Sequence, residues 1–101
     1  MTYRIAWRAN ADLEAIWDYI AKDNPAAADH LELRIHITIE MLSQFPRMGR
    51  PRKDVSDKRY LFFSVGAYVI AYRMDGMQLI VVRVLHGARD FRNLFRRKSR
   101  S

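Results

Sequence analysis

The chain has 101 residues, half of them hydrophobic, and a formal net charge of +7 at pH 7. This length predicts one domain with a single modest core, and the hydrophobic fraction excludes disorder for the body of the chain. The sequence contains no cysteine, which excludes a disulfide framework and a cysteine-based zinc site. It also has no apolar run of membrane-spanning length and no signal-peptide core. We therefore expect a soluble, cytoplasmic protein.

Positive charge is concentrated in two segments of the chain. Residues 89–101 contain six basic side chains and one acidic one, and residues 47–59 contain six basic and two acidic ones. Clustered charge of this kind favours an anionic partner, such as nucleic acid, an acidic protein or the ribosome. A solvated loop and a solvated tail would have the same composition, so the charge alone leaves both interpretations open.

The first half of the chain predicts one strand and two helices. Residues 3–7 alternate in polarity, which indicates a short edge strand. Apolar residues then recur at helical spacing over Asn10–Lys22, with Asn10 placed to cap this helix. A second helix is expected over Ala26–Phe45, capped by Asn24 at an Asn-Pro break.

The second helix carries two apolar stripes on roughly opposite sides. The stripe expected to pack on a sheet consists of Ala28, Leu31, Ile35, Ile39 and Leu42. The other stripe consists of Leu33, Ile37 and Met41. It must meet the first helix, an end of the sheet or a partner, because exposed apolar patches commonly mark interaction sites.

The second half of the chain predicts a loop and three strands. Proline and glycine mark residues 46–57 as a loop. Strands are expected over Arg59–Val65, Tyr68–Met74 and Met77–His86, and the last two flank Asp75-Gly76, a dipeptide typical of a type I′ turn. The last strand is apolar on both faces, so we expect it to lie centrally. Helices can cover one of its faces, and the sequence shows nothing that covers the other.

The order β-α-α-β-β-β predicts an α+β fold. A helical hairpin would pack on one face of a mainly antiparallel sheet, followed by a short C-terminal basic segment. The pairing of the first strand stays open. We expect residues 1–96 to form one domain and residues 97–101 to be a basic tail that frays.

Several motifs, taken in order, resemble the ParE branch of the ParE/RelE toxins of type II toxin–antitoxin systems. They are Ala11-Asp12-Leu13-Glu14-Ala15-Ile16, Tyr19-Ile20-Ala21, Leu42, Pro46, Gly49-Arg50, Tyr68-Val69-Ile70-Ala71-Tyr72-Arg73 and Val84-Leu85-His86-Gly87-Ala88-Arg89-Asp90. The likeness covers about residues 3–95.

The resemblance implies a toxin that a cognate, ParD-like antitoxin neutralises by wrapping it. Proteins similar to ParE are described as inhibitors of DNA gyrase, whereas RelE-like relatives cleave messenger RNA on the ribosome. We therefore expect a non-enzymatic protein toxin that binds gyrase, needs no cofactor and no membrane, and meets DNA only through the antitoxin or gyrase. The antitoxin would bind Leu33, Ile37 and Met41, together with Tyr19 of the first helix. A ribosome-dependent mRNA endonuclease is the alternative.

The alternative needs a base, an acid and cations around the scissile phosphate. His86 is the one good titratable candidate, and Arg83 and Arg89 lie near it in sequence. The RelE-type site, however, is built from a denser set of Lys, Arg and Tyr side chains, and His86 could instead stabilise a turn or bind a partner. His30 and His36 lie about 120° apart on a helix, so we expect no metal site.

The C-terminal segment has a functional and a structural interpretation. Phe91, Leu94 and Phe95 recur at helical spacing, so their apolar side could dock on the body. In the functional interpretation the basic residues of this segment bind the target. These residues are Arg89, Arg92, Arg96 and Arg97. In the structural interpretation the apolar residues cap the core and the end frays.

Overall fold

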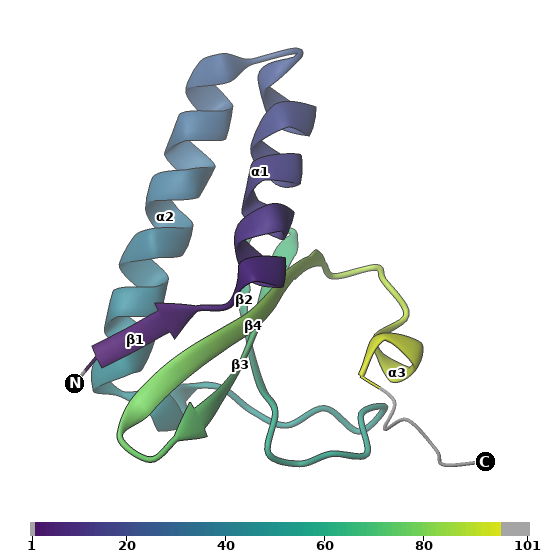
Figure 1. Ribbon diagram of the computed structural model, residues 1–101. Coiled ribbons are helices and arrows are strands. Elements are labelled where there is room, and N and C mark those ends of the chain that lie inside the picture. Colours follow the sequence, from purple (N-terminus) through teal and green to yellow (C-terminus); the bar gives the residue numbers. More distant parts are fainter. Residues whose placement is uncertain (1, 96–101) are drawn as a thin grey trace.

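The computed structural model describes residues 2–95 (Figure 1). The elements are β1 (Thr2–Ile5), α1 (Trp7–Ala21), α2 (Pro25–Gln44), the 3₁₀ helix η1 (Pro46–Met48), β2 (Leu61–Val65), β3 (Tyr68–Asp75), β4 (Gln78–His86) and α3 (Phe91–Leu94). This order confirms the predicted α+β fold and adds two short helices. The predicted tail, residues 97–101, lies outside the described residues. In the part of the chain that is described, no helix is long and apolar enough to cross a membrane.

The sheet has the strand order β1-β4-β3-β2. Strands β2, β3 and β4 form an antiparallel meander, and β1 pairs with β4 in parallel. This arrangement places β4 centrally, as its two apolar faces predict, and settles the open pairing of the first strand.

The turn between β3 and β4 differs from the predicted type. Asp75 pairs with Gln78 in the ladder, so Gly76 and Met77 are the two central residues. Of these only Gly76 has a positive φ, at 61°. A two-residue turn with glycine first is the type II′ pattern, which also suits the twist of a hairpin. The hairpin is therefore confirmed, but the type I′ turn centred on Asp75-Gly76 is wrong.

Helix α1 begins earlier than the sequence predicts. The backbone N–H of Ala6 donates to Val81 O of β4 at 2.9 Å, so the chain is still held by the sheet one residue before the helix starts. The N–H of Asn10 donates to Ala6 O at 3.0 Å, which places Asn10 inside the helix and makes the predicted cap wrong. Asn24 does cap α2, because its Oδ1 accepts from the N–H of Ala27 at 3.0 Å.

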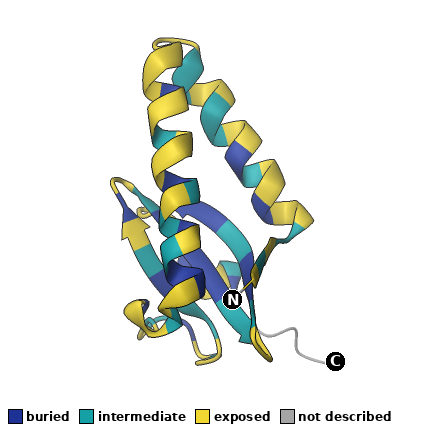
Figure 2. Cartoon of the chain, turned by 90° about the vertical axis from the view of Figure 1, so that its left-hand side faces the viewer, coloured by how far each residue is buried: buried dark blue, intermediate teal, exposed yellow. Residues whose placement is uncertain are grey.

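Both faces of the sheet are covered (Figure 1). On one face the first predicted stripe of α2 packs with α1 in the larger core, while the outward sides of the helices stay exposed (Figure 2). On the other face lies a second cluster, formed by Val55, Phe62, Val69, Ala71, Leu85, Phe91 and Phe95. The expectation that nothing covers this face is wrong, because the long loop and the C-terminal segment supply the cover.

Tyr72 connects the larger core to the segment that follows α2. Its side chain is fully buried, and its hydroxyl accepts from the N–H of Gly49 at 2.9 Å and donates to Pro46 O. A Cβ on Gly49 would lie 2.8 Å from ring atoms of Tyr72, closer than real Cβ atoms come. Only glycine therefore lets the backbone lie this close to the ring.

We expect Tyr72→Phe to lower the free energy of unfolding by about 1–3 kcal/mol, because two buried backbone groups lose their partner. Burial raises the pKa of the Tyr72 phenol, so its contribution is complete below the ordinary value of about 10 and is lost as pH rises through the native-state pKa. Urea unfolding of both proteins between pH 7 and 11 checks this. Parallel pH profiles would show that Tyr72 does not contribute in this way.

Candidate functional site

An ion pair joins α1 to the C-terminal half of β4, beyond the residues of β4 that pair with β1. Arg83 donates from Nε to Asp12 Oδ2 at 2.7 Å and from Nη2 to Asp12 Oδ1 at 2.9 Å. The backbone N–H of Val84 donates to Asp12 Oδ2 at 3.0 Å. Both side chains are largely buried, and the hydrogen bonds to Asp12 raise the pKa of the Arg83 guanidinium. Arg83 is therefore engaged in holding the helix to the strand.

His86 ends β4 and stabilises the turn that follows. Its Nδ1 accepts from the N–H of Ala88 at 3.1 Å, and its ring meets Tyr68 edge-on with the centroids 5.4 Å apart. An Nδ1 that accepts a hydrogen bond leaves the proton of the neutral ring on Nε2. In this arrangement Nδ1 of His86 is engaged by the turn and the ring packs against Tyr68.

The three candidate catalytic residues line two different depressions. His86 and Arg89 line a groove of about 190 Å³ between α1 and the ends of β3 and β4, where Tyr19 also lies. Arg83 lines a depression of about 340 Å³ on the opposite face of the sheet. The structure thus does not bring Arg83 together with His86 around one ligand.

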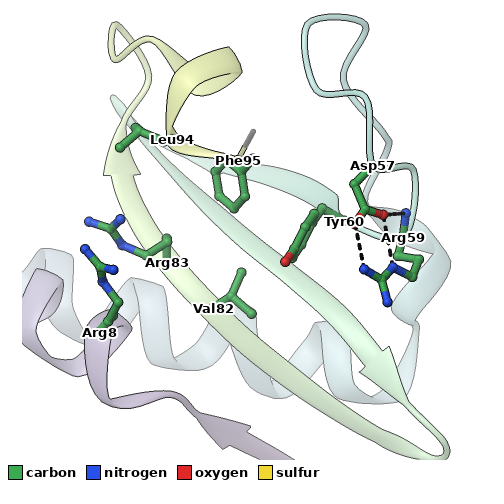
Figure 3. A pocket seen from close by; sticks show the side chains of 8 residues that line it. All are labelled: Arg8, Asp57, Arg59, Tyr60, Val82, Arg83, Leu94 and Phe95. Atoms are coloured by element: carbon green, nitrogen blue, oxygen red, sulfur yellow. Dashed lines mark hydrogen bonds and ion pairs between the residues drawn. The ribbon is translucent and has the colours of Figure 1, made fainter. Parts of the chain in front are cut away.

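The larger depression contains residues that the sequence analysis did not single out (Figure 3). Arg8 and Arg83 lie together at one end, the Asp57–Arg59 ion pair lies at the other, and Tyr60, Val82 and Phe95 lie between them (Figure 3). The ion pair is bidentate, with nitrogen–oxygen distances of 3.0 and 2.7 Å. A cationic depression with an aromatic wall can hold an anionic group, but its described lining offers no histidine as a base.

A β-bulge shapes this depression. Tyr72 pairs with Val81 and Ala71 pairs with Arg83, so Val82 has no partner on β3. Neighbouring residues in a regular strand point to opposite faces, and a bulge relaxes that alternation. Val82 and Arg83 can therefore line the same depression although they are adjacent in the chain. No local sequence signal marks this bulge.

The C-terminal segment is held on the sheet by an arginine from the long loop. The guanidinium of Arg52 lies 4.1 Å from the ring centroid of Phe91 and 5.7 Å from that of Phe62. Arg52 also donates to both carboxylate oxygens of Asp54, at 2.9 and 3.0 Å, and these bonds lower the pKa of the Asp54 carboxyl. Phe91 and Phe95 therefore dock on the body of the protein, as their helical spacing predicts.

Comparison with known proteins gives the family. The family described as "ParE toxin of type II toxin-antitoxin system, parDE" matches residues 3–91. The chain belongs to this toxin family. It is 35% identical to Toxin ParE1 of Caulobacter vibrioides, over 89% of this chain and 93% of that protein, and 39% identical to Toxin RelE2 of the same organism, over 82% and 91%.

Solved structures of toxin–antitoxin systems share the fold. The chromosomal ParDE system from P. aeruginosa aligns with a TM-score of 0.71 at 21% identity, over 85% of this chain and 95% of that chain. The RelBE2 complex from Mycobacterium tuberculosis aligns with a TM-score of 0.58 at 24% identity, over 84% and 95%. Relatives with both names match this ParE-family toxin, so likeness alone does not separate a gyrase inhibitor from an mRNA endonuclease.

An apolar ridge runs along the outward side of α2 in this ParE-family toxin. Leu33 and Ile37 are 58% and 59% exposed, and Met41 is half-buried. The exposed side chains of Phe45 and Met48, which the sequence analysis did not single out, follow in the next residues. We define the α2 ridge as Leu33, Ile37 and Met41, since Phe45 and Met48 lie past the end of α2. Its exposure leaves the second predicted stripe without an intramolecular partner over most of its length.

Tyr19, the fourth candidate antitoxin residue, is 72% exposed but lines the groove beside His86. Trp17 is half-buried between the two helices, and its Nε1 donates to Asp29 at 2.9 Å. Among the residues that the structure describes, no group of three or more His, Asp or Glu side chains is arranged to hold a metal ion.

The candidate target-binding arginines divide into three groups. Arg92 is exposed on α3, near enough to Asp54 to lower the pKa of that carboxyl alongside the stronger effect of Arg52. Arg89 is exposed in the groove beside His86. Arg96 and Arg97 lie outside the described residues.

Proposed function

We propose that this toxin acts by binding DNA gyrase, without catalytic residues of its own, in the cytoplasm where gyrase works. The engagement of Arg83 and His86 carries this proposal. Arg83 is bound to Asp12, and the Nδ1 of His86 accepts from the turn. An endonuclease needs a free base and free cations around one phosphate, and these residues offer neither in their present arrangement.

The experiment that tests the proposal is a plasmid supercoiling and cleavage assay with purified gyrase, ATP and the isolated toxin. We expect lost supercoiling and accumulated double-strand breaks. Unaffected gyrase at a large molar excess of correctly folded toxin would rule out this target.

We propose a ParD-like antitoxin as the neutralising partner, seated along the α2 ridge. An apolar ridge at helical spacing, exposed at Leu33 and Ile37, suits an amphipathic helix of the partner. The similarity to a protein named for a ParDE system supports an antitoxin of this type. Tyr19 lies on the neighbouring helix α1, where it lines the groove beside His86, so an antitoxin would have to extend around the hairpin to contact both.

Ile37→Asp is expected to weaken antitoxin binding by about 30-fold, or roughly 2 kcal/mol, as is typical of an interface hot spot. Ile37 is exposed, so the fold should tolerate the change. Titration calorimetry with the cognate antitoxin measures the effect. Met77→Asp is the matched control, because Met77 is an exposed apolar residue in the turn between β3 and β4. Equal losses in the two variants would contradict the ridge assignment.

A ribosome-dependent mRNA endonuclease is the second candidate. The cationic depression with Arg8, Arg59, Arg83 and Tyr60 favours it, because guanidinium groups can stabilise a phosphorane-like charge. The similarity to a protein named Toxin RelE2 also supports it. This function would need a residue of the depression, or His86 after a ring rotation, to act as the base.

If the toxin is an endonuclease centred on His86, His86→Gln should abolish cleavage of mRNA on programmed ribosomes while the thermal midpoint stays nearly unchanged. Tyr60→Phe tests whether the catalytic site is instead the cationic depression, because this change removes only a hydroxyl from its lining. Under the gyrase proposal, neither the wild-type toxin nor the two variants cleave mRNA. All three should then inhibit gyrase supercoiling to the same extent.

A further inference from the structure

Acidic and basic side chains are unevenly distributed between the helical hairpin and the rest of the chain. The helical hairpin, residues 7–44, has seven acidic and three basic side chains, a net charge of −4. Residues 45–101 have fourteen basic and four acidic side chains, a net charge of +10. Figure 1 shows the far end of the hairpin standing clear of the sheet, away from α3 and the long loop. A polyanion would therefore be attracted to the loop and α3 side and repelled from the hairpin.

The fold joins the two basic segments that are separate in the sequence. Arg52 of the loop stacks on Phe91, Tyr60 meets Phe95 with centroids 5.1 Å apart, and Val55 lies in the same cluster. Arg92 is close enough to Asp54 for their charges to interact. The loop and α3 thus bring basic side chains of both segments to the same side of the sheet, and we define the basic face as Arg52, Lys53, Lys58, Arg59 and Arg92.

Among residues 2–95, Lys53, Lys58 and Arg92 form no ion pair with a carboxylate. Arg52 pairs with Asp54 and Arg59 pairs with Asp57, whereas Lys58 donates only to the carbonyls of Arg52 and Val55, at 2.7 and 2.8 Å. Lys53 and Arg92 are exposed, and neither forms an ion pair within residues 2–95. The chain continues from this face into Arg96, Arg97, Lys98 and Arg100, which lie beyond the described part.

The shape and chemistry of the face favour the backbone of duplex DNA. Single strands are bound chiefly by exposed aromatic rings that stack on bases. Here Phe62, Phe91 and Phe95 are 7%, 0% and 9% exposed, and Tyr60 is half-buried with its ring against Phe95. Reading of bases needs an element that enters a groove, and α3 has only four residues. What remains is a set of cations that can neutralise phosphates without regard to sequence.

We propose that the basic face binds the phosphates of duplex DNA directly and without sequence preference. The function goes beyond gyrase binding, since it needs no gyrase and no antitoxin. A toxin that holds both its target enzyme and the DNA on that enzyme would engage the complex in preference to the free enzyme.

Fluorescence anisotropy of a labelled 20-base-pair duplex with the isolated toxin tests this proposal between 50 and 200 mM NaCl. We expect a dissociation constant of about 1–100 µM, with log K falling against log salt at a slope of about −2.7 or steeper, as three or more phosphate contacts require. Lys53→Gln/Arg92→Gln should weaken binding about tenfold and reduce the slope by about 1.8.

Arg4→Gln/Arg34→Gln is the matched control. It removes the same charge from exposed residues of β1 and α2, away from the basic face, and should change affinity less than threefold. Equal losses in the two double variants would overturn the proposal, since only net charge would then matter. Clear preference for single-stranded DNA of the same length, or tighter binding of polyglutamate, would overturn the duplex assignment in favour of stacking or of an acidic protein.

Because the assay contains only toxin and DNA, its failure would leave the gyrase proposal standing. Conversely, if the toxin binds duplex DNA but leaves gyrase active, only the gyrase proposal is contradicted. Circular dichroism and a thermal melt of each double variant confirm that the fold is intact before affinities are compared.

Discussion

A chain that ends at Asp90 is expected to be largely unfolded at room temperature, whereas a chain that ends at Phe95 should fold like the full-length toxin. The difference comes from Phe91 and Phe95, which are 0% and 9% exposed and cover the second face of the sheet. Losing a buried phenylalanine costs about 3–5 kcal/mol, and a domain of this size has about 5–15 kcal/mol in total.

Urea unfolding followed by near-ultraviolet circular dichroism measures this difference. Phe91→Ala should lose about 3 kcal/mol by itself. Arg92→Ala, one residue further along and exposed, is the matched control and should stay within about 0.5 kcal/mol of the wild type. A chain ending at Asp90 that unfolds cooperatively at the wild-type midpoint would show that the second cluster contributes little.

The chain that ends at Phe95 also tests whether the basic tail binds the target, separately from its effect on folding. The chain ending at Phe95 keeps the second cluster but lacks Arg96, Arg97, Lys98 and Arg100. Under the gyrase proposal it should fold, bind the antitoxin and lose most of its inhibition of supercoiling. Full inhibition by this shorter chain would remove the tail from the target-binding surface and leave that role to Arg92 and Arg89.

The sequence predicted those parts of the fold whose signal is local. The 3.6-residue period of the second helix, its Asn24 cap and the apolar strands around Gly76 are patterns within one element, and the structure has each of them. The central position of β4 followed from a property of that strand alone, because a strand that is apolar on both faces must be covered on both.

The second cluster could not be predicted in the same way. Phe91 and Phe95 stand in a strongly basic segment, and Val55 stands among charged loop residues, so composition points to solvent. They are buried against the sheet, and Arg52 stacks on the ring of Phe91, 39 positions further along the chain. A guanidinium group that stacks on an aromatic ring cannot be distinguished, from sequence alone, from one that is free on the surface.

The candidate site shows the same limit. Arg83 and His86 are close in sequence and at the end of one strand, which suggested a shared role. Instead, a β-bulge lies at Val82, and Arg83 forms an ion pair with Asp12. The depression that Arg83 lines also contains Arg8 and Arg59, which come from other parts of the chain. Bulges and long-range ion pairs leave no periodic trace, so only the three-dimensional arrangement reveals which cations are available.

Asp12→Ala is expected to lower the free energy of unfolding by about 3 kcal/mol. The Asp12 and Arg83 side chains are only 15% and 17% exposed, so loss of the carboxylate leaves a largely desolvated guanidinium without its partner. The N–H of Val84 loses its acceptor as well. Removing one member of a buried pair costs about 3–5 kcal/mol, and residual solvent contact brings the expectation to the lower end of that range.

The double variant Asp12→Leu/Arg83→Met distinguishes an unpaired charge from lost packing. Replacing both members by apolar residues removes the desolvated charge, so stability should recover by at least half of the loss seen in Asp12→Ala. Asp18→Ala, an exposed acidic position on the same helix, is the control and should change stability by less than about 0.5 kcal/mol. If the double variant were no more stable than Asp12→Ala, the pair would matter through the acceptor for Val84, and Asp12→Asn, which keeps one carbonyl oxygen, should then restore most of the stability.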